Sequence, residues 1–211
     1  MKLMLCDISP AVVDAWKNQF SRYPDVEVRE VSILDVQADA LVNPGNSFGF
    51  MDGGLSLKIA ERFGGFQIED AVRAAIRERF NGEMLVGQAA VFPTGSAPPY
   101  MVYAPTMRTP QAIQNTVNVY LAARAAFQAV QAFNAAAGKT PDRPGGHIAR
   151  IAFPGLGTGT GRMNPLVSAR QLRYAYEEAA GLRKKGDQNL SRLARREKKL
   201  KEIPVEKDGE E

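Results

Sequence analysis

Short apolar runs alternate with helical patterns along most of the chain. The apolar runs, each typical of a buried strand, cover residues 2–6, 26–31, 38–43, 88–92, 100–104 and 149–153. Helical spacing of apolar residues marks 10–20, 55–63, 66–80, 109–137 and 165–180. Strands that alternate with helices favour a sheet covered on both faces. The pattern therefore predicts an α/β fold, a three-layer α/β/α sandwich around a mixed, mostly parallel sheet.

The core pattern ends near residue 182, which divides the chain into a domain at 1–182 and a charged tail at 183–211. The tail carries ten Lys/Arg and seven Asp/Glu, so it holds most of the net charge of +4. Leu190, Leu193 and Leu200 fit a weak apolar stripe on a basic surface helix, and we expect disorder toward the acidic end. A solvated tail and a tail that contacts nucleic acid both fit this composition.

Composition excludes several classes of protein. Hydrophobic residues make up 45% of the chain and charged residues 24%, as in ordinary globular domains. No apolar run reaches about 18 residues, and the start of the chain lacks the features of a signal peptide, so we expect a cytoplasmic protein without a membrane partner. One cysteine, Cys6, and one histidine, His147, are too few for a disulfide or an ordinary zinc site. We therefore expect no metal.

Two glycine-rich loops carry the candidate chemistry. Residues 43–56 read NPGNSFGFMDGGLS and residues 154–165 read PGLGTGTGRMNP, and each lies between a strand and a helix. Glycine lets backbone N–H groups approach an anion, and a helix N-terminus adds partial positive charge. Two such loops facing each other would cradle a diphosphate, while Asn43 and Asn46 would offer amides to ribose hydroxyls. The alternative for either loop is a purely structural turn.

These residues resemble the signature of the macro domains. The strand Asp39-Ala40-Leu41-Val42-Asn43 is followed by Pro44-Gly45-Asn46-Ser47 and then Gly53-Gly54, and the family's second loop is similar to Gly157-Thr158-Gly159-Thr160-Gly161. The resemblance extends over about residues 1–182. It implies a cleft for ADP-ribose, or for the ADP-ribosyl group of a modified macromolecule, and no cofactor.

The resemblance also implies roles for single residues in the two loops. Asn46 is similar to the asparagine that bonds the distal ribose. Gly53, Gly54 and Leu55 resemble the segment beside the diphosphate and the distal ribose. Residues 157–161 resemble the loop that wraps the diphosphate.

The adenine end departs from the family pattern. Many members place an aspartate on the adenine amino group, whereas Ser32 and Ile33 stand at that place here. A serine can still accept a hydrogen bond but carries no charge. Asp35 and Asp7 are the alternatives for this contact.

Three more side chains are candidates for ligand contacts. Phe48 and Phe50 flank a glycine of the first loop, where they would either line the distal-ribose side of the cleft or anchor the loop in the core. Arg162 follows the second loop and would clamp a phosphate with two hydrogen bonds, unless it is an exposed surface arginine.

Catalytic groups are incomplete by comparison with the family. The first loop is most similar to the branches that remove ADP-ribose from glutamate or from DNA, yet Ser56 and Gly161 stand where the family's hydrolases carry acids. Asp52, with Asn46, is then the catalytic candidate, as a general base for water. Alternatively, Asp52 caps the next helix. Three functions remain open: ADP-ribose binding, ADP-ribosyl hydrolysis, and a nucleic-acid-associated module tethered by the tail.

Overall fold

The computed structural model describes residues 1–137, 146–183 and 189–203. Within these ranges six strands form one sheet in the order β2-β1-β6-β3-β5-β4. The strands are β1 (Lys2–Asp7), β2 (Val26–Glu30), β3 (Ala40–Asn43), β4 (Ala90–Pro93), β5 (Tyr100–Tyr103) and β6 (Arg150–Phe153). Every neighbouring pair is parallel except β4 with β5. The mixed, mostly parallel sheet predicted from the sequence is confirmed.

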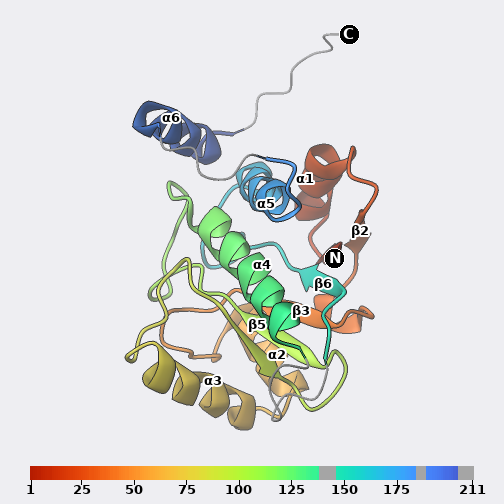
Figure 1. Cartoon of the computed structure of the whole chain (residues 1–211), viewed down its shortest axis with the longest axis vertical. Coiled ribbons are helices and arrows are strands. Elements are labelled where there is room, and N and C mark those ends of the chain that lie inside the picture. The colour runs from red at the N-terminus through yellow and green to blue at the C-terminus, as the bar shows by residue number, and fades with distance from the viewer. Residues whose placement is uncertain (138–145, 184–188, 204–211) are drawn as a thin grey trace.

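Helices cover both faces of the sheet (Figure 1). One layer holds α1 (Pro10–Phe20), α4 (Asn118–Ala136) and α5 (Pro165–Ala179), and the other holds α2 (Gly54–Arg62) and α3 (Phe66–Arg79). Helix α6 (Leu190–Lys201), in the charged tail, lies outside the first layer against α5. The three-layer sandwich is therefore confirmed. The described helices include none that is long and apolar enough to cross a bilayer, and residues 204–211, where we expect disorder, lie outside the described ranges.

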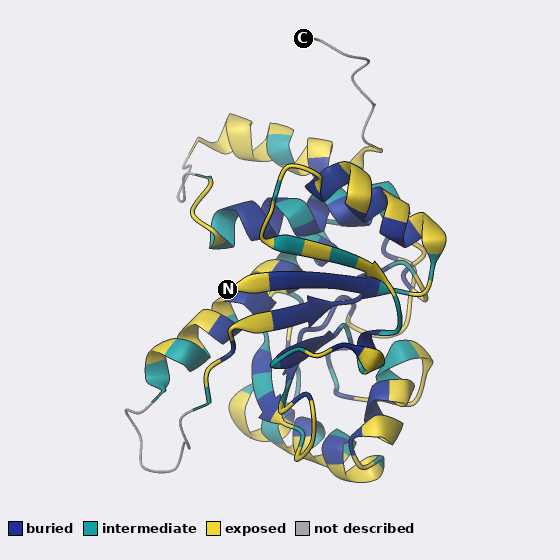
Figure 2. Ribbon diagram, turned by 90° about the vertical axis from the view of Figure 1, so that its right-hand side faces the viewer, coloured by how far each residue is buried: buried dark blue, intermediate teal, exposed yellow. Residues whose placement is uncertain are grey.

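Alternate residues of a central strand enter opposite layers of the core. In β1, Leu3 and Leu5 pack beneath α1, α4 and α5, while Met4 and Cys6 pack beneath α2 and α3. Both faces of β1 and β3 are thus buried (dark blue in Figure 2), which explains their continuous apolar sequences. Burial also raises the pKa of the Cys6 thiol to about 12, so this cysteine stays protonated and serves as a small apolar residue.

The predicted helix at 109–137 is wrong in its first part, because α4 begins at Asn118. The backbone N–H of Ile113 donates to the carbonyl of Gly161 at 2.8 Å, and the Thr116 hydroxyl donates to the carbonyl of Ile113 at 2.8 Å. These bonds hold 109–117 against the second glycine loop in a non-helical conformation. The segment therefore becomes a wall beside that loop.

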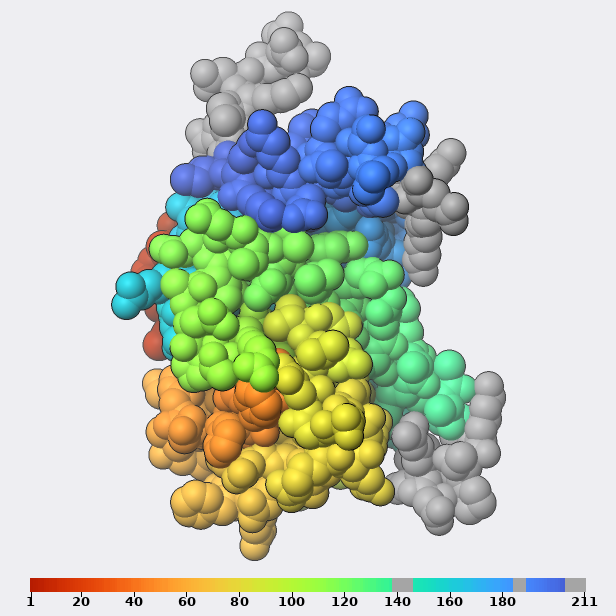
Figure 3. All heavy atoms as spheres, turned by 90° about the vertical axis from the view of Figure 1, so that its left-hand side faces the viewer, coloured from red at the N-terminus to blue at the C-terminus, as the bar shows by residue number. Residues whose placement is uncertain are grey.

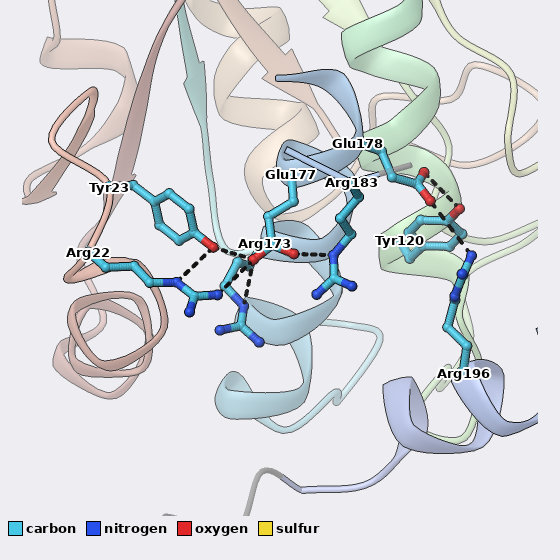
Figure 4. Close-up of polar contacts among 8 residues, drawn as sticks. All are labelled: Arg22, Tyr23, Tyr120, Arg173, Glu177, Glu178, Arg183 and Arg196. Carbon is cyan, nitrogen blue, oxygen red and sulfur yellow. Dashed lines mark hydrogen bonds and ion pairs between the residues drawn. The ribbon is translucent and has the colours of Figure 1, made fainter. Parts of the chain in front are cut away.

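A buried carboxylate at the end of α5 joins distant parts of the first layer (Figure 4). Glu177 is 3% exposed, accepts hydrogen bonds from Tyr23 and Arg183, and pairs with Arg22 at 3.1 Å. Burial raises the pKa of Glu177, but the hydrogen bonds from Tyr23 and Arg183 outweigh burial and hold the pKa below its ordinary value. The ionised carboxylate thus fixes the end of α5 against the loop after α1.

Candidate functional site

A cleft of about 520 Å³ opens at the carboxyl ends of the parallel strands. Its walls are the segments that follow β1, β3, β5 and β6, and α2 and α5 begin at its rim. Figure 3 shows the first glycine loop, in orange, beside the segment after β5, in green. Ligands of parallel α/β sheets bind at this edge, and the volume is that of an ordinary small-molecule site.

The glycines of the second loop divide into crowded and open positions. A Cβ at Gly157, whose φ is +71°, would lie 2.9 Å from Cγ2 of Val119, and a Cβ at Gly161 would lie 2.5 Å from the carbonyl oxygen of Gly157. A Cβ at Gly159, by contrast, would meet no atom within 4 Å. Tight packing therefore requires glycine at 157 and 161, whereas 159 borders open space in the cleft.

Backbone amides of both loops are available to a ligand. Within the described chain, the cleft-lining residues that donate no backbone hydrogen bond include Gly53, Gly54, Leu55, Gly159, Thr160 and Gly161. The first three belong to the N-terminal turn of α2. Helix α5 begins at the same rim, and the side chain of Asn164 caps it by accepting from the amide of Leu166 at 2.9 Å. Bare amides and helix N-termini together attract an anion.

Asn46 shapes the first loop from within. Its Oδ1 accepts from the amides of Phe48 and Phe50 at 3.0 and 3.4 Å, and its Nδ2 donates to the Phe50 carbonyl at 2.8 Å. The Tyr103 hydroxyl donates to the Asn46 carbonyl at 2.8 Å, and burial raises the pKa of Tyr103, so the phenol keeps its proton. Asn46 is 8% exposed and lines the cleft. Its side chain thus has a structural task besides any contact with ribose.

Two polar side chains at the cleft were missed or given a minor place by sequence reasoning. Asp7 accepts from the amide of Ser9 and from the amide of Gly155, both at 2.9 Å, so it ties β1 to the second loop. Thr106 is 1% exposed and lines the cleft, and its Oγ1 has no hydrogen-bond partner among the described residues. The position of Asp7 at a strand end was the available signal, whereas nothing in the sequence around Thr106 marks it.

Comparison with known proteins agrees with this geometry. Residues 42–172, from β3 into α5, match the Macro domain family. The chain belongs to the Macro domain family. An uncharacterized protein of Aquifex aeolicus (strain VF5) is 34% identical over 149 residues, which cover 70% of this chain and 78% of that protein. An uncharacterized protein of Aeropyrum pernix is 30% identical over 144 residues, covering 68% of this chain and 66% of its own length.

Solved structures share the fold of this macro domain. The macrodomain of Mycobacterium tuberculosis DarG has a TM-score of 0.55 at 22% identity, over 70% of this chain and 86% of that one. Thermosipho africanus DarTG in complex with ADP-ribose has a TM-score of 0.55 at 14% identity, over 71% and 38%. The Oceanobacillus iheyensis macrodomain with ADP has a TM-score of 0.53 at 17% identity, over 69% and 71%. At these identities the likeness concerns the fold.

Several residues expected to bind ligand do not line the cleft of this macro domain. The Ser32 hydroxyl accepts from the amide of Leu34 at 3.2 Å, and Ile33 is 3% exposed in the core beneath α2 and α3. Arg162 is exposed and has a φ of +52° at the end of the second loop. Ser32, Ile33 and Arg162 are therefore not among the residues that line the cleft, and their expected contacts with a ligand remain predictions.

Asn43 is also absent from the cleft wall. It is fully buried, its Oδ1 accepts from the Ser56 hydroxyl at 2.6 Å, and its Nδ2 lies 3.6 Å from Sδ of Met101. The amide thus joins the end of β3 to the first turn of α2. Ser56 itself lines the cleft.

The two phenylalanines of the first loop differ in position. Phe48 is half-buried away from the cleft, with the Arg108 guanidinium 5.1 Å from its ring centroid, and Arg108 is paired with Glu83 at 2.7 Å. Phe50 lines the cleft and is 42% exposed, with the Arg73 guanidinium 4.3 Å from its ring centroid. Of the two, only Phe50 lines the cleft.

Asp52 does not cap a helix, which corrects one of the two roles considered for it. Gly53 occupies the N-cap of α2, and no side chain makes a capping hydrogen bond there. Asp52 is exposed, lines the cleft and makes no hydrogen bond to another described residue. Its carboxylate is therefore free to meet a ligand or a water molecule. No three His, Cys, Asp or Glu side chains in the described ranges gather as a metal site.

Proposed function

We propose that this macro domain binds ADP-ribose, or the ADP-ribosyl group of a modified macromolecule, in the cleft between its two glycine loops. The observation that carries the proposal is the set of bare amides on both loops, beside the first turns of α2 and α5. A diphosphate would accept hydrogen bonds from residues 53–55 on one side and 159–161 on the other. The solved macrodomain with ADP and DarTG with ADP-ribose support this ligand class through the shared fold.

The ends of the cleft suggest how the ligand would lie. Asp7 ends β1 and keeps lone pairs on both oxygens, so we assign the adenine amino group to Asp7 in place of Ser32. Asn46, Phe50 and Asp52 belong to the first loop, which would then hold the distal ribose. Adenine and distal ribose would thus lie on either side of the diphosphate.

Hydrolysis of an ADP-ribosyl bond is the second candidate, and the free carboxylate of Asp52 favours it. Asp52 would take a proton from the water that attacks the anomeric carbon of the distal ribose, while the bond to the modified group breaks and the leaving group takes up a proton. The likeness of the first loop to the glutamate and DNA branches makes those linkages the substrates to try. An Asp52→Asn variant should keep ADP-ribose affinity and lose release from such substrates. Release at the wild-type rate would remove Asp52 as the base.

Calorimetric titration tests binding itself. We expect micromolar affinity for ADP-ribose and at least about tenfold weaker affinity for AMP, because AMP lacks the second phosphate and the distal ribose. NAD serves as a control with a blocked distal ribose. An absence of heat with ADP-ribose would overturn the proposal.

A Gly159→Val variant tests whether ADP-ribose binds between the two glycine loops. The free protein has room for a side chain at this position, so stability should be unchanged, while the added methyl groups occupy the ligand's space. We expect ADP-ribose affinity to fall by at least about tenfold. Thr160→Val is the matched control in the same loop, because it retains the amide and the side-chain volume.

The compartment is also part of the proposal. Cys6 is a free, buried thiol, which suits a reducing compartment. We therefore propose the cytoplasm, and fractionation of cells that contain the protein would test this.

A further inference from the structure

Helix α6 carries six Lys/Arg and one Glu in twelve residues, and it is docked in a defined orientation. Leu200 is 4% exposed, and its carbonyl accepts from Nε2 of Gln171 at 3.0 Å. Arg196 pairs with Glu178 of α5 at 4.0 Å (Figure 4), and its guanidinium lies 5.1 Å from the ring centroid of Tyr174. These contacts fix which side of α6 faces the domain and which faces outward (Figure 1).

The outward side carries four cations, Arg192, Arg195, Lys198 and Lys199, which we call the basic stripe. At 100° per residue these four positions fall within an arc of about 120°, turned away from Leu200. All four are exposed, and within the described chain none forms an ion pair with a carboxylate. Arg195 bonds only to the Ser191 carbonyl of its own helix, at 3.3 Å. Among the described residues, the four cations of the stripe therefore have no carboxylate partner.

We propose that the basic stripe binds the phosphate backbone of a duplex nucleic acid. From Arg192 to Lys199 the helix rises roughly 10 Å, over which a duplex presents about six phosphates. Helix α6 has no aromatic residue, so it lacks the stacking surface of single-strand binders. The stripe has no apolar residue either, so it lacks the face that an interfacial membrane helix buries. A surface that offers positive charge but no aromatic or apolar side chains is suited to the phosphates of a duplex.

The docking contacts also hold the basic stripe in fixed relation to the cleft. Gln171 is fully buried, and besides Leu200 its Nε2 donates to the carbonyl of Thr116 at 2.8 Å. Thr116 belongs to the wall segment whose Ile113 is bonded to Gly161 in the second glycine loop. A duplex on the stripe would therefore lie in a defined orientation to the ligand site. The stripe proposal nevertheless does not depend on what the cleft binds.

Fluorescence anisotropy with a labelled DNA duplex of about 20 base pairs, free of ADP-ribose, tests the proposal. The stripe variant replaces all four cations: Arg192→Gln, Arg195→Gln, Lys198→Gln and Lys199→Gln. It leaves the docking residues Leu200, Arg196 and Gln171 in place. The matched control removes the same charge from exposed positions elsewhere: Lys2→Gln, Lys17→Gln, Arg77→Gln and Arg79→Gln.

We expect wild-type affinity to fall steeply with salt. The stripe variant should bind at least about tenfold more weakly, with a salt slope smaller by about 3, and the control should stay within about threefold of wild type. Equal loss in both variants, or no binding by the wild type, would overturn the proposal. So would tighter binding to single-stranded DNA or to phosphatidylserine vesicles than to the duplex. Circular dichroism and ADP-ribose titration of the stripe variant separate these outcomes from failure of the fold or the cleft.

Discussion

The two glycine loops of the cleft hold their shape by different means. The first is held by side chains: Asn46 bonds the backbone of Phe48 and Phe50, and Asn43 bonds Ser56 across its base. In the second, backbone bonds such as Met163 to Gly157 at 2.9 Å and tight contacts around the glycines add to side-chain bonds from Asp7, Thr158 and Ser168. Both leave unpaired amides on the cleft wall.

The difference shows that glycine has two separate tasks in one site. Gly157 and Gly161 are required by neighbouring atoms, and the loop cannot pack with a larger residue there. Gly53 and Gly159 face open space, and their value is the access that they give to the backbone. Substitution should therefore separate loss of stability from loss of binding.

The largest effect is expected for Gly157→Val. The valine would contact Val119 and Ile113 at 3.0 Å or less and would adopt a φ of +71°, which is unfavourable for a branched residue. We expect the free energy of unfolding to fall by about 3 kcal/mol, measured by urea denaturation. Gly159→Val is the control and should stay within about 0.5 kcal/mol of wild type. Equal losses would contradict the division into crowded and open glycines.

Asn46→Ala should give the next largest effect, because it leaves two loop amides without their acceptor. We expect a loss of about 2 kcal/mol in the free energy of unfolding. Asn46→Asp keeps the acceptor for the two amides but sets a carboxylate oxygen against the Phe50 carbonyl, so it should also be less stable than wild type. If both variants were as stable as wild type in urea denaturation, the first loop would not depend on this side chain.

Asp7→Asn tests the second loop by the same logic. An amide side chain offers one acceptor oxygen, so one of the two amides, Ser9 or Gly155, loses its partner. We expect a loss of about 1 kcal/mol in chemical denaturation. Calorimetry should also show weaker ADP-ribose binding with unchanged affinity for ribose 5-phosphate. Equal weakening for both ligands would place Asp7 away from adenine.

Thr106→Val should have the smallest effect on stability. Its Oγ1 is buried without a partner, so a methyl group in its place should change the free energy of unfolding by less than about 0.5 kcal/mol. If the Thr106 hydroxyl forms a hydrogen bond with the ligand, ADP-ribose affinity measured by calorimetry should fall severalfold. Unchanged affinity would show that Thr106 lines the cleft without bonding the ligand.

Sequence reasoning predicted the sheet and both loops because these depend on local patterns. Buried parallel strands give continuous apolar runs, and glycine clusters mark where strands end. The segment 109–117 was misjudged because Thr109-Pro110 is typical of a helix start, while the bond from Ile113 to Gly161 joins residues far apart in the chain. The conformation of 109–117 thus depends on a contact with a distant part of the chain, which local sequence patterns do not reveal.

The sequence predicted best those site residues that act through their backbone amides, and less well those that act through their side chains. Gly53 and Gly159 lie in the two glycine-rich loops that the sequence shows directly, and the resemblance to the macro domains implied their roles. Ser32 and Asn43 were chosen by their place in a motif, yet one bonds its own turn and the other is buried at the base of α2. The direction in which a side chain points depends on packing between layers, which no single segment encodes.

The measurement that tests the central claim most directly is a ¹⁵N–¹H NMR titration of the protein with ADP-ribose. The account predicts that amide signals of both loops, at Gly53, Gly54, Gly159 and Thr160, shift together and saturate at one ligand concentration. Signals from Lys2 and Arg150, at the ends of β1 and β6 opposite the cleft, should stay in place. Shifts confined to one loop, or located outside the cleft, would contradict a diphosphate cradle formed by the two loops together.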